Sequence, residues 1–131
     1  MKQAKSSFKI LNSSEEPYSE EEGGRNLTSG IHTTEYSGDL EGRSILMELK
    51  NYTTKSSASV YGLERFTGTL DGKSGTFVAE HIGLYNSGMI VSTRTIVANS
   101  ATGELKGLKG KANFEAFGSE KFEITFEYSF E

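Results

Sequence analysis

The chain has no cysteine, no tryptophan and only one proline among its 131 residues. The lack of cysteine excludes disulfide bonds and thiolate chemistry. Two histidines without an H-E-x-x-H motif predict no metal site. The chain also lacks a G-x-x-x-x-G-K-[ST] phosphate loop and a G-x-S-x-G nucleophile turn, so it shows neither of these nucleotide-binding and hydrolase signatures. We expect no cofactor.

Positive charge and long apolar runs are also scarce. The formal net charge is −4, which leaves no basic surface for a phosphate backbone. No apolar run approaches the roughly 20 residues that cross a bilayer, and the start MKQAKSSFKI has no apolar secretion signal. We therefore expect a cytoplasmic protein that binds neither nucleic acid nor membrane.

Alternation of apolar and polar residues is the main pattern that the chain does contain. It is clearest over 121–131, where aromatic or aliphatic residues take every second position, as on a strand with one buried face. Weaker alternation predicts further strands, all within a single domain spanning 1–131. The predicted strands are 5–13, 27–37, 42–53, 57–70, 74–85, 89–99, 109–117 and 121–131.

Short connections join most of these segments, including 37–42, 70–75, 85–89 and 117–121. Such connections are typical of antiparallel hairpins. Closing eight such strands on themselves removes both sheet edges. The sequence thus predicts an all-β fold, an eight-stranded antiparallel up-and-down β-barrel, with a two-sheet sandwich as the alternative.

The segment 12–26 differs from the rest because it is acidic and nearly free of aliphatic residues. Its glutamates suggest a cation site, but they lack the ligand spacing and the placed glycine of a calcium loop. We therefore interpret the segment as a solvated loop that binds no divalent cation.

The hairpin around 70–75 has two possible registers. A turn at Asp71-Gly72 places Glu64 opposite Ala79, whereas a turn at Gly72-Lys73 places Glu64 opposite His81. The second register also pairs Arg65 with Glu80, and each complementary pair is worth up to about 1 kcal/mol. Charge matching therefore favours the turn at Gly72-Lys73.

Small and aromatic residues share one face of this hairpin, as they do inside small barrels. That face includes Glu64 and His81, which we expect to form a pair inside the barrel. A three-residue loop at 86–88 would then place Thr93 beside His81 on the inner face. It would also give an outer ladder of Arg65, Glu80 and Arg94.

The outward positions in this register are less polar than a monomer requires. They predict a subunit interface, and hence a homo-oligomer. The residues concerned are Leu63, Val78, Ile82, Leu84, Ile90 and Ile96.

Several blocks resemble a known family. The blocks are YSGDLEG at 36–42, YGLERFTGTLDGKSGTFVAEHIG at 61–83, TGELKGLKG at 102–110 and the acidic EEPYSEEEGG near the start. In order and spacing they are similar to the small bacterial family known as domain of unknown function 3224. The resemblance implies an allene oxide cyclase-like barrel, which is lipocalin-like (calycin-like) in shape, and it carries no assigned activity.

Three functions fit these observations. The first is binding of a small apolar or amphipathic ligand in the barrel mouth, with candidate contacts Tyr61, Glu64, Phe66, Phe77, His81 and Thr93. The second is a cofactor-free isomerase or cyclase in which Glu64 and His81 act as the catalytic pair. The third is a barrel filled by its own phenylalanines, which serves as an oligomeric scaffold. A cavity smaller than the roughly 300 Å³ typical of ligand sites would rule out the first two.

Overall fold

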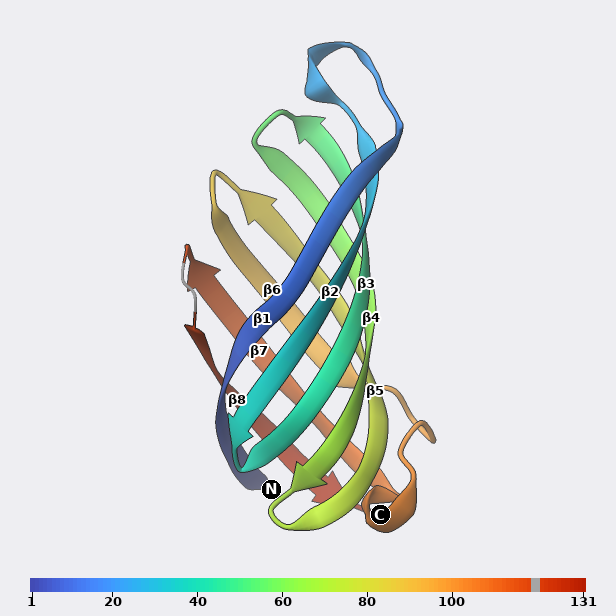
Figure 1. Ribbon diagram of the computed structural model, residues 1–131, viewed down its shortest axis with the longest axis vertical. Coiled ribbons are helices and arrows are strands. Elements are labelled where there is room, and N and C mark those ends of the chain that lie inside the picture. Colours follow the sequence, from blue (N-terminus) through green and yellow to red (C-terminus); the bar gives the residue numbers. More distant parts are fainter. Residues whose placement is uncertain (119–120) are drawn as a thin grey trace.

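The protein is a closed barrel of eight antiparallel strands, each paired with the next along the chain and β8 paired with β1 (Figure 1). The computed structural model describes residues 1–118 and 121–131. The barrel confirms the predicted fold and excludes the sandwich. The strands are β1 (Lys2–Ser19), β2 (Leu27–Gly38), β3 (Leu40–Thr54), β4 (Ser57–Leu70), β5 (Lys73–Asn86), β6 (Met89–Ile96), β7 (Leu108–Phe117) and β8 (Lys121–Phe130).

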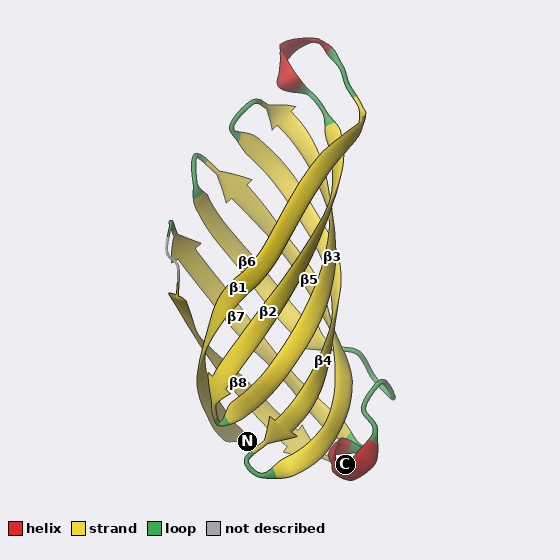
Figure 2. Ribbon diagram, in the orientation of Figure 1, coloured by secondary structure: helices red, strands yellow, loops and turns green. Residues whose placement is uncertain are grey.

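Figure 2 shows how little of the chain lies outside the strands. Two short 3-10 turns, η1 (Glu22–Gly24) and η2 (Gly103–Leu105), are the other regular elements of the described residues. No helix within 1–118 or 121–131 is long and apolar enough to cross a membrane.

The acidic segment is only partly a loop, so that part of the prediction was wrong. β1 continues to Ser19, and its pairing with β2 shifts register between Ile10 and Asn12. This bulge reverses the alternation, so that Ser13 and Glu15 lie opposite the inward positions of β2. The acidic residues are tolerated in a strand because this part of the sheet extends past the barrel into solvent.

The turn between β4 and β5 is Asp71-Gly72, not the predicted Gly72-Lys73. Both residues have positive φ, 48° and 84°, as a type I′ turn requires. Glu64 therefore lies opposite Ala79, and His81 lies opposite Gly62. The twist of a type I′ turn matches that of the flanking strands, and this preference outweighed the charge pairs of the other register.

The turn between β5 and β6 is also shorter than predicted. Ser87 and Gly88 form a two-residue turn with φ of 49° and 91°. The loss of one residue exchanges the two faces of β6. Arg94 is therefore buried opposite His81, whereas Thr93 is exposed.

This exchange corrects two further predictions. The outer ladder of Arg65, Glu80 and Arg94 does not form, because Arg94 lies inside the barrel. Ile96 is buried and Ile90 lines the interior, so neither belongs to the outer surface set.

The lower half of the barrel is filled with side chains. The Phe66 and Phe77 rings stack with their centroids 5.0 Å apart. Leu105 of η2 closes the end beneath them and is fully buried. At Gly75 an added Cβ would lie 2.1 Å from the Thr102 carbonyl oxygen, so η2 can approach β5 only at a glycine.

The other end is open and slanted. Figure 1 shows the hairpin ends stepping down from the β1–β2 connection through the β3–β4 connection to the β5–β6 connection, with both termini at the closed end. The long β1–β2 ribbon therefore rises above the barrel wall on one side. Inward residues near this end are accessible from the mouth.

Candidate functional site

The open half of the barrel encloses a cavity of about 250 Å³. Its walls are mostly apolar, and polar groups are concentrated at its floor and on one side of its rim. The wall residues include Phe8, Leu46, Val60, Ile90, Phe114 and Phe122. The volume lies below the roughly 300 Å³ given above as the limit for the ligand-binding and enzyme hypotheses, so that criterion goes against both of them for a ligand of drug size or a lipid. The limit was set for drug-sized ligands, and about 250 Å³ still admits a smaller molecule.

Five consecutive strands each contribute one inward polar residue to the floor. These residues are Tyr36 from β2, Ser44 from β3, Glu64 from β4, His81 from β5 and Arg94 from β6. All five are buried. Because their strands are neighbours in the sheet, the polar groups form one connected network.

Glu64 is the centre of this floor network. Its Oε1 is 2.8 Å from Nε2 of His81. Its Oε2 accepts hydrogen bonds from the Tyr36 hydroxyl at 2.6 Å and the Ser44 hydroxyl at 2.5 Å. The pairing of Glu64 and His81 inside the barrel, expected from the sequence, is confirmed. They meet diagonally rather than directly opposite each other, beside the small residues Gly62 and Ala79.

The surroundings keep Glu64 ionised. Burial by itself would raise its pKa, but the hydrogen bond from His81 and the positive charge of Arg94 outweigh that and lower the pKa to about 2. Burial, together with the charge of Glu64, raises the pKa of Tyr36 well above its usual value. Tyr36 therefore remains a neutral hydrogen-bond donor to a carboxylate.

His81 keeps one nitrogen for other interactions. An ionised carboxylate can only accept, so Nε2 is the nitrogen that donates to Glu64. Nδ1 has no hydrogen-bond partner among the residues that the structure describes. His81 lines the cavity, so this nitrogen is the candidate for contact with a bound molecule.

Arg94 is the other charged group of the floor. Its guanidinium lies 4.4 Å from the centroid of the Phe114 ring and 5.1 Å from that of Phe8. Its Nη1 is 3.5 Å from the Tyr36 hydroxyl, at the limit of a hydrogen bond. Its Nε and the Ser92 hydroxyl are the buried side-chain polar atoms without a partner in the described part of the chain. Both residues line the cavity.

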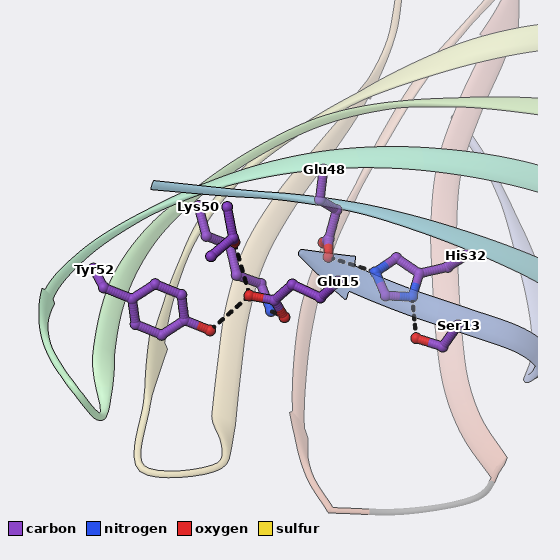
Figure 3. Close-up of polar contacts among 7 residues, drawn as sticks. Ser13, Glu15, His32, Glu48, Lys50 and Tyr52 are labelled. Carbon is purple, nitrogen blue, oxygen red and sulfur yellow. Dashed lines mark hydrogen bonds and ion pairs between the residues drawn. The ribbon is translucent and has the colours of Figure 1, made fainter. Parts of the chain in front are cut away.

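A second histidine–glutamate pair lies at the rim. Figure 3 shows Ser13, His32 and Glu48 in a row across β1, β2 and β3. The Ser13 hydroxyl is 2.6 Å from Nδ1 of His32, and Nε2 of His32 is 2.9 Å from Glu48. Burial by itself would raise the pKa of Glu48, but the hydrogen bond and charge of His32 lower it. Glu48 therefore orients the ring so that Nδ1 faces the serine.

Glu15 links the extended ribbon to the barrel wall, also in Figure 3. Its carboxylate accepts from the Thr28 hydroxyl at 2.7 Å, the Tyr52 hydroxyl at 2.9 Å and the Lys50 ammonium at 3.2 Å. Glu15, an acidic residue of the 12–26 segment, is thus anchored to the barrel by hydrogen bonds from three side chains. No group of three or more His, Asp or Glu side chains in the described ranges is arranged to hold a metal ion.

Residues 4–128 match the model of the family described as Protein of unknown function (DUF3224). The chain belongs to this family. A crystal structure of another DUF3224 protein of unknown function, from Shewanella oneidensis MR-1, has 28% sequence identity and a TM-score of 0.79 over 99% of each chain. No curated protein matches the chain.

The DUF3224 barrel places the predicted contact residues in three different regions. Glu64 and His81 lie at the cavity floor. Phe66 and Phe77 are buried in the filled half below it. Tyr61 is 52% exposed on the outer surface, and Thr93 is also outside, where its hydroxyl donates to Asn113 at 3.2 Å.

The sequence patterns did not predict that Arg94 faces the interior, or that Ser13, His32 and Glu48 meet at the rim. The three-residue turn predicted at 86–88 placed Arg94 on the outer face, and Ser92 was not among the candidates. The Ser-Gly dipeptide was the signal for a two-residue turn, since such turns require positive φ at both positions. The rim residues His32 and Glu48 carry no local signal, because only the register of β2 and β3 brings them together.

Proposed function

We propose that this protein binds a small amphipathic molecule in the cavity, with a hydrogen-bond acceptor such as a carboxylate at Arg94 and Ser92. The observation that carries this proposal is that Arg94 and Ser92, which both line an open and mostly apolar cavity, each have a buried polar atom without a partner: Nε of Arg94 and the hydroxyl of Ser92. A buried polar group without a partner costs about 1–3 kcal/mol. A ligand that supplies the acceptor offsets that cost.

The balance of donors and acceptors at the floor favours an acceptor on the ligand. Glu64 accepts from three protein donors and has little capacity left. Arg94 has five N–H groups, of which one faces the Tyr36 hydroxyl. The floor therefore offers mainly donors, and a carboxylate complements the positive charge of Arg94.

The walls and the volume set the size of the apolar part. The aromatic rings of Phe8, Phe114 and Phe122 contact one another at centroid distances of 5.0 to 5.9 Å on one side of the cavity. A volume of about 250 Å³ corresponds to about eight water molecules at roughly 30 Å³ each. We therefore expect a short alkyl chain or a single ring.

Hexanoate and benzoate are suitable probes, with hexanol as the uncharged control. Thermal unfolding is measured with each compound at millimolar concentration, because a ligand that binds the native state raises the melting temperature. We expect hexanoate to raise it more than hexanol does. The Arg94→Met variant should lose this preference, whereas Arg43→Met, which removes an exposed arginine, should retain it. No shift with either acid, or an equal shift in Arg94→Met, would contradict the proposal.

His81 favours a second function, proton transfer to or from the bound molecule. Its imidazole lines the cavity and is oriented by Glu64 through the 2.8 Å hydrogen bond. Glu64 itself fits the role of base poorly, because a pKa of about 2 makes it far too weak near neutral pH. In this hypothesis His81 carries the proton and Glu64 orients it. Exchange of the α-hydrogens of a small ketone such as cyclohexanone for deuterium in heavy water, lost in His81→Gln, would support it. Absence of exchange in the wild-type protein would rule out proton transfer and leave ligand binding as the one proposed function.

A further inference from the structure

The outer surface of β3, β4 and β5 carries a group of large apolar side chains in contact with solvent. Each strand contributes two, and their exposed fractions range from 47% to 63%. We call this group the outer apolar face. Its residues are Met47, Leu49, Tyr61, Leu63, Ile82 and Leu84.

Strand register makes the outer apolar face continuous. Met47 lies opposite Leu63, and Leu49 lies opposite Tyr61. Tyr61 in turn lies opposite Ile82 on the next strand. The face extends further to Ile31 beside Met47, Ile45 on β3 and Val91 beside Leu84, all exposed. The side chains therefore form one patch across β2 to β6.

The area of this patch suits a protein interface. Nine large apolar side chains that are about half exposed present on the order of 600 Å² of apolar surface. That is at the upper end of the largest patches found on monomers, roughly 300–600 Å². A standard interface buries about 800 Å² per partner, and homodimer interfaces are about 65% apolar. One copy of this patch therefore supplies the apolar area that one side of a dimer needs.

Two opposite charges lie within the patch. Arg65 is opposite Val78, and Glu80 is opposite Leu63, so the two charged residues sit diagonally on neighbouring strands. Neither forms an ion pair within residues 1–118 and 121–131. A two-fold axis through the patch can place each Arg65 against Glu80 of the other copy. The patch is thus self-complementary in charge, as an isologous interface requires.

The same charges disfavour a lipid surface as the occupant. Peripheral membrane faces combine apolar side chains with a cluster of lysine and arginine. Here one arginine is balanced by one glutamate, and the whole chain has a net charge of −4. A second copy of this chain fits the apolar area and the paired charges together.

We propose that the protein is a two-fold symmetric homodimer joined through the outer apolar face, with Arg65 of each copy paired to Glu80 of the other. This inference is independent of the ligand proposal, because the face lies on the outside of the wall and the cavity opens at the barrel end. Dimerisation places the two cavities on one particle and leaves both mouths accessible.

Light scattering after size exclusion, at 10–100 µM protein, measures the assembly. We expect twice the chain mass of 14.3 kDa for the wild-type protein. The Leu63→Glu variant should elute as a monomer with an unchanged circular dichroism spectrum, because its side chain is already exposed. Lys2→Glu, an exposed substitution on β1, is the control and should remain dimeric.

Charge reversal tests the symmetry of the interface. Arg65→Glu and Glu80→Arg should each weaken association at least tenfold, and the double variant should restore it. A monomeric wild type, a particle of three or more copies, or a dimer that persists in both Leu63→Glu and Arg65→Glu would overturn the proposal. The hexanoate-dependent melting shift should survive in the Leu63→Glu monomer, so failure of the dimer and failure of ligand binding are distinguished.

Discussion

Both histidines of the chain pair with a glutamate, but the two pairs differ in their surroundings. The His81–Glu64 side chains at the floor are 3% and 5% exposed, whereas those of His32–Glu48 at the rim are 14% and 12% exposed. On β2 and β3, the rim residues His32 and Glu48 lie four residues, or about 13 Å, from Tyr36 and Ser44 of the floor network. The same chemistry therefore occurs at two depths of one cavity.

Depth changes what each pair does. Water reaches the floor pair only through the cavity, and the pair shares its carboxylate with Tyr36 and Ser44. The rim pair is close to water, and its serine is exposed. We infer that the floor network fixes the shape of the barrel interior. The rim network orients His32 and Glu48 at the mouth of the cavity.

The largest loss of stability is expected when the charge of Glu64 at the floor is removed. Glu64→Gln should lower the free energy of unfolding by about 3 kcal/mol, because a buried carboxylate with three donors is lost and Arg94 is left without a compensating charge. The matched rim variant Glu48→Gln should cost about 1 kcal/mol. Urea unfolding at pH 7 measures both. Equal costs would show that depth does not separate the two pairs.

Acid should remove nearly as much stability as that substitution. The pKa of Glu64 is lowered from 4.5 to about 2, so between these values the unfolded chain binds more protons than the native protein. The contribution of Glu64 is complete above about pH 4.5 and is lost as the pH falls towards 2, with a total on the order of 3 kcal/mol. Unfolding free energies measured from pH 6 to pH 2 should fall less steeply for Glu64→Gln. An unchanged slope in that variant would contradict the assignment.

Removing one tyrosine hydroxyl should have a moderate effect. Tyr36→Phe removes the 2.6 Å donor to Glu64 and the acceptor facing Arg94, at an expected cost of about 1.5–2 kcal/mol. Tyr52→Phe is the rim control. It removes a donor to the more exposed Glu15 and should cost about 0.5 kcal/mol. The comparison would fail if Tyr52→Phe proved the more costly of the two.

The smallest change in stability is expected from a substitution of Ser13, the exposed serine of the rim network. Ser13→Ala removes an exposed hydroxyl from His32 and should change the unfolding free energy by no more than about 0.5 kcal/mol. Thermal melting of wild type and variant in the same buffer is sufficient to detect a larger change. A loss above 1 kcal/mol would mean that the rim network is part of the structural framework.

The barrel itself was predictable because its signal is local. Alternation over 121–131 and short turn segments are properties of neighbouring residues, and together they specify strands and antiparallel hairpins. The inward direction of Glu64 and His81 was also predictable. Any two-residue turn within residues 70–75 places Glu64 and His81 on the same face, whichever register forms.

The composition of the site depended on the length of one turn, which is a local feature, and on the pairing of distant strands. A single residue in the length of the 86–88 turn determined whether Arg94 or Thr93 faces the interior, because side chains alternate along a strand. The bulge after Ile10 likewise exchanged the two faces of β1, so that Ser13 and Glu15 lie opposite inward residues of β2. His32 and Glu48 met only because β2 and β3 pair over their whole length.

The sequence by itself determined an all-β chain of alternating strands, a closed meander and a buried glutamate–histidine pair. Tertiary structure decided the depth of each polar group, and with it the lowered pKa of Glu64 and the position of Arg94 over two aromatic rings. The physical reason is one of range. Alternation and turn type depend on residues that are neighbours in the sequence. Burial and electrostatic interaction depend on strands that are far apart in the chain and that closure of the barrel brings together.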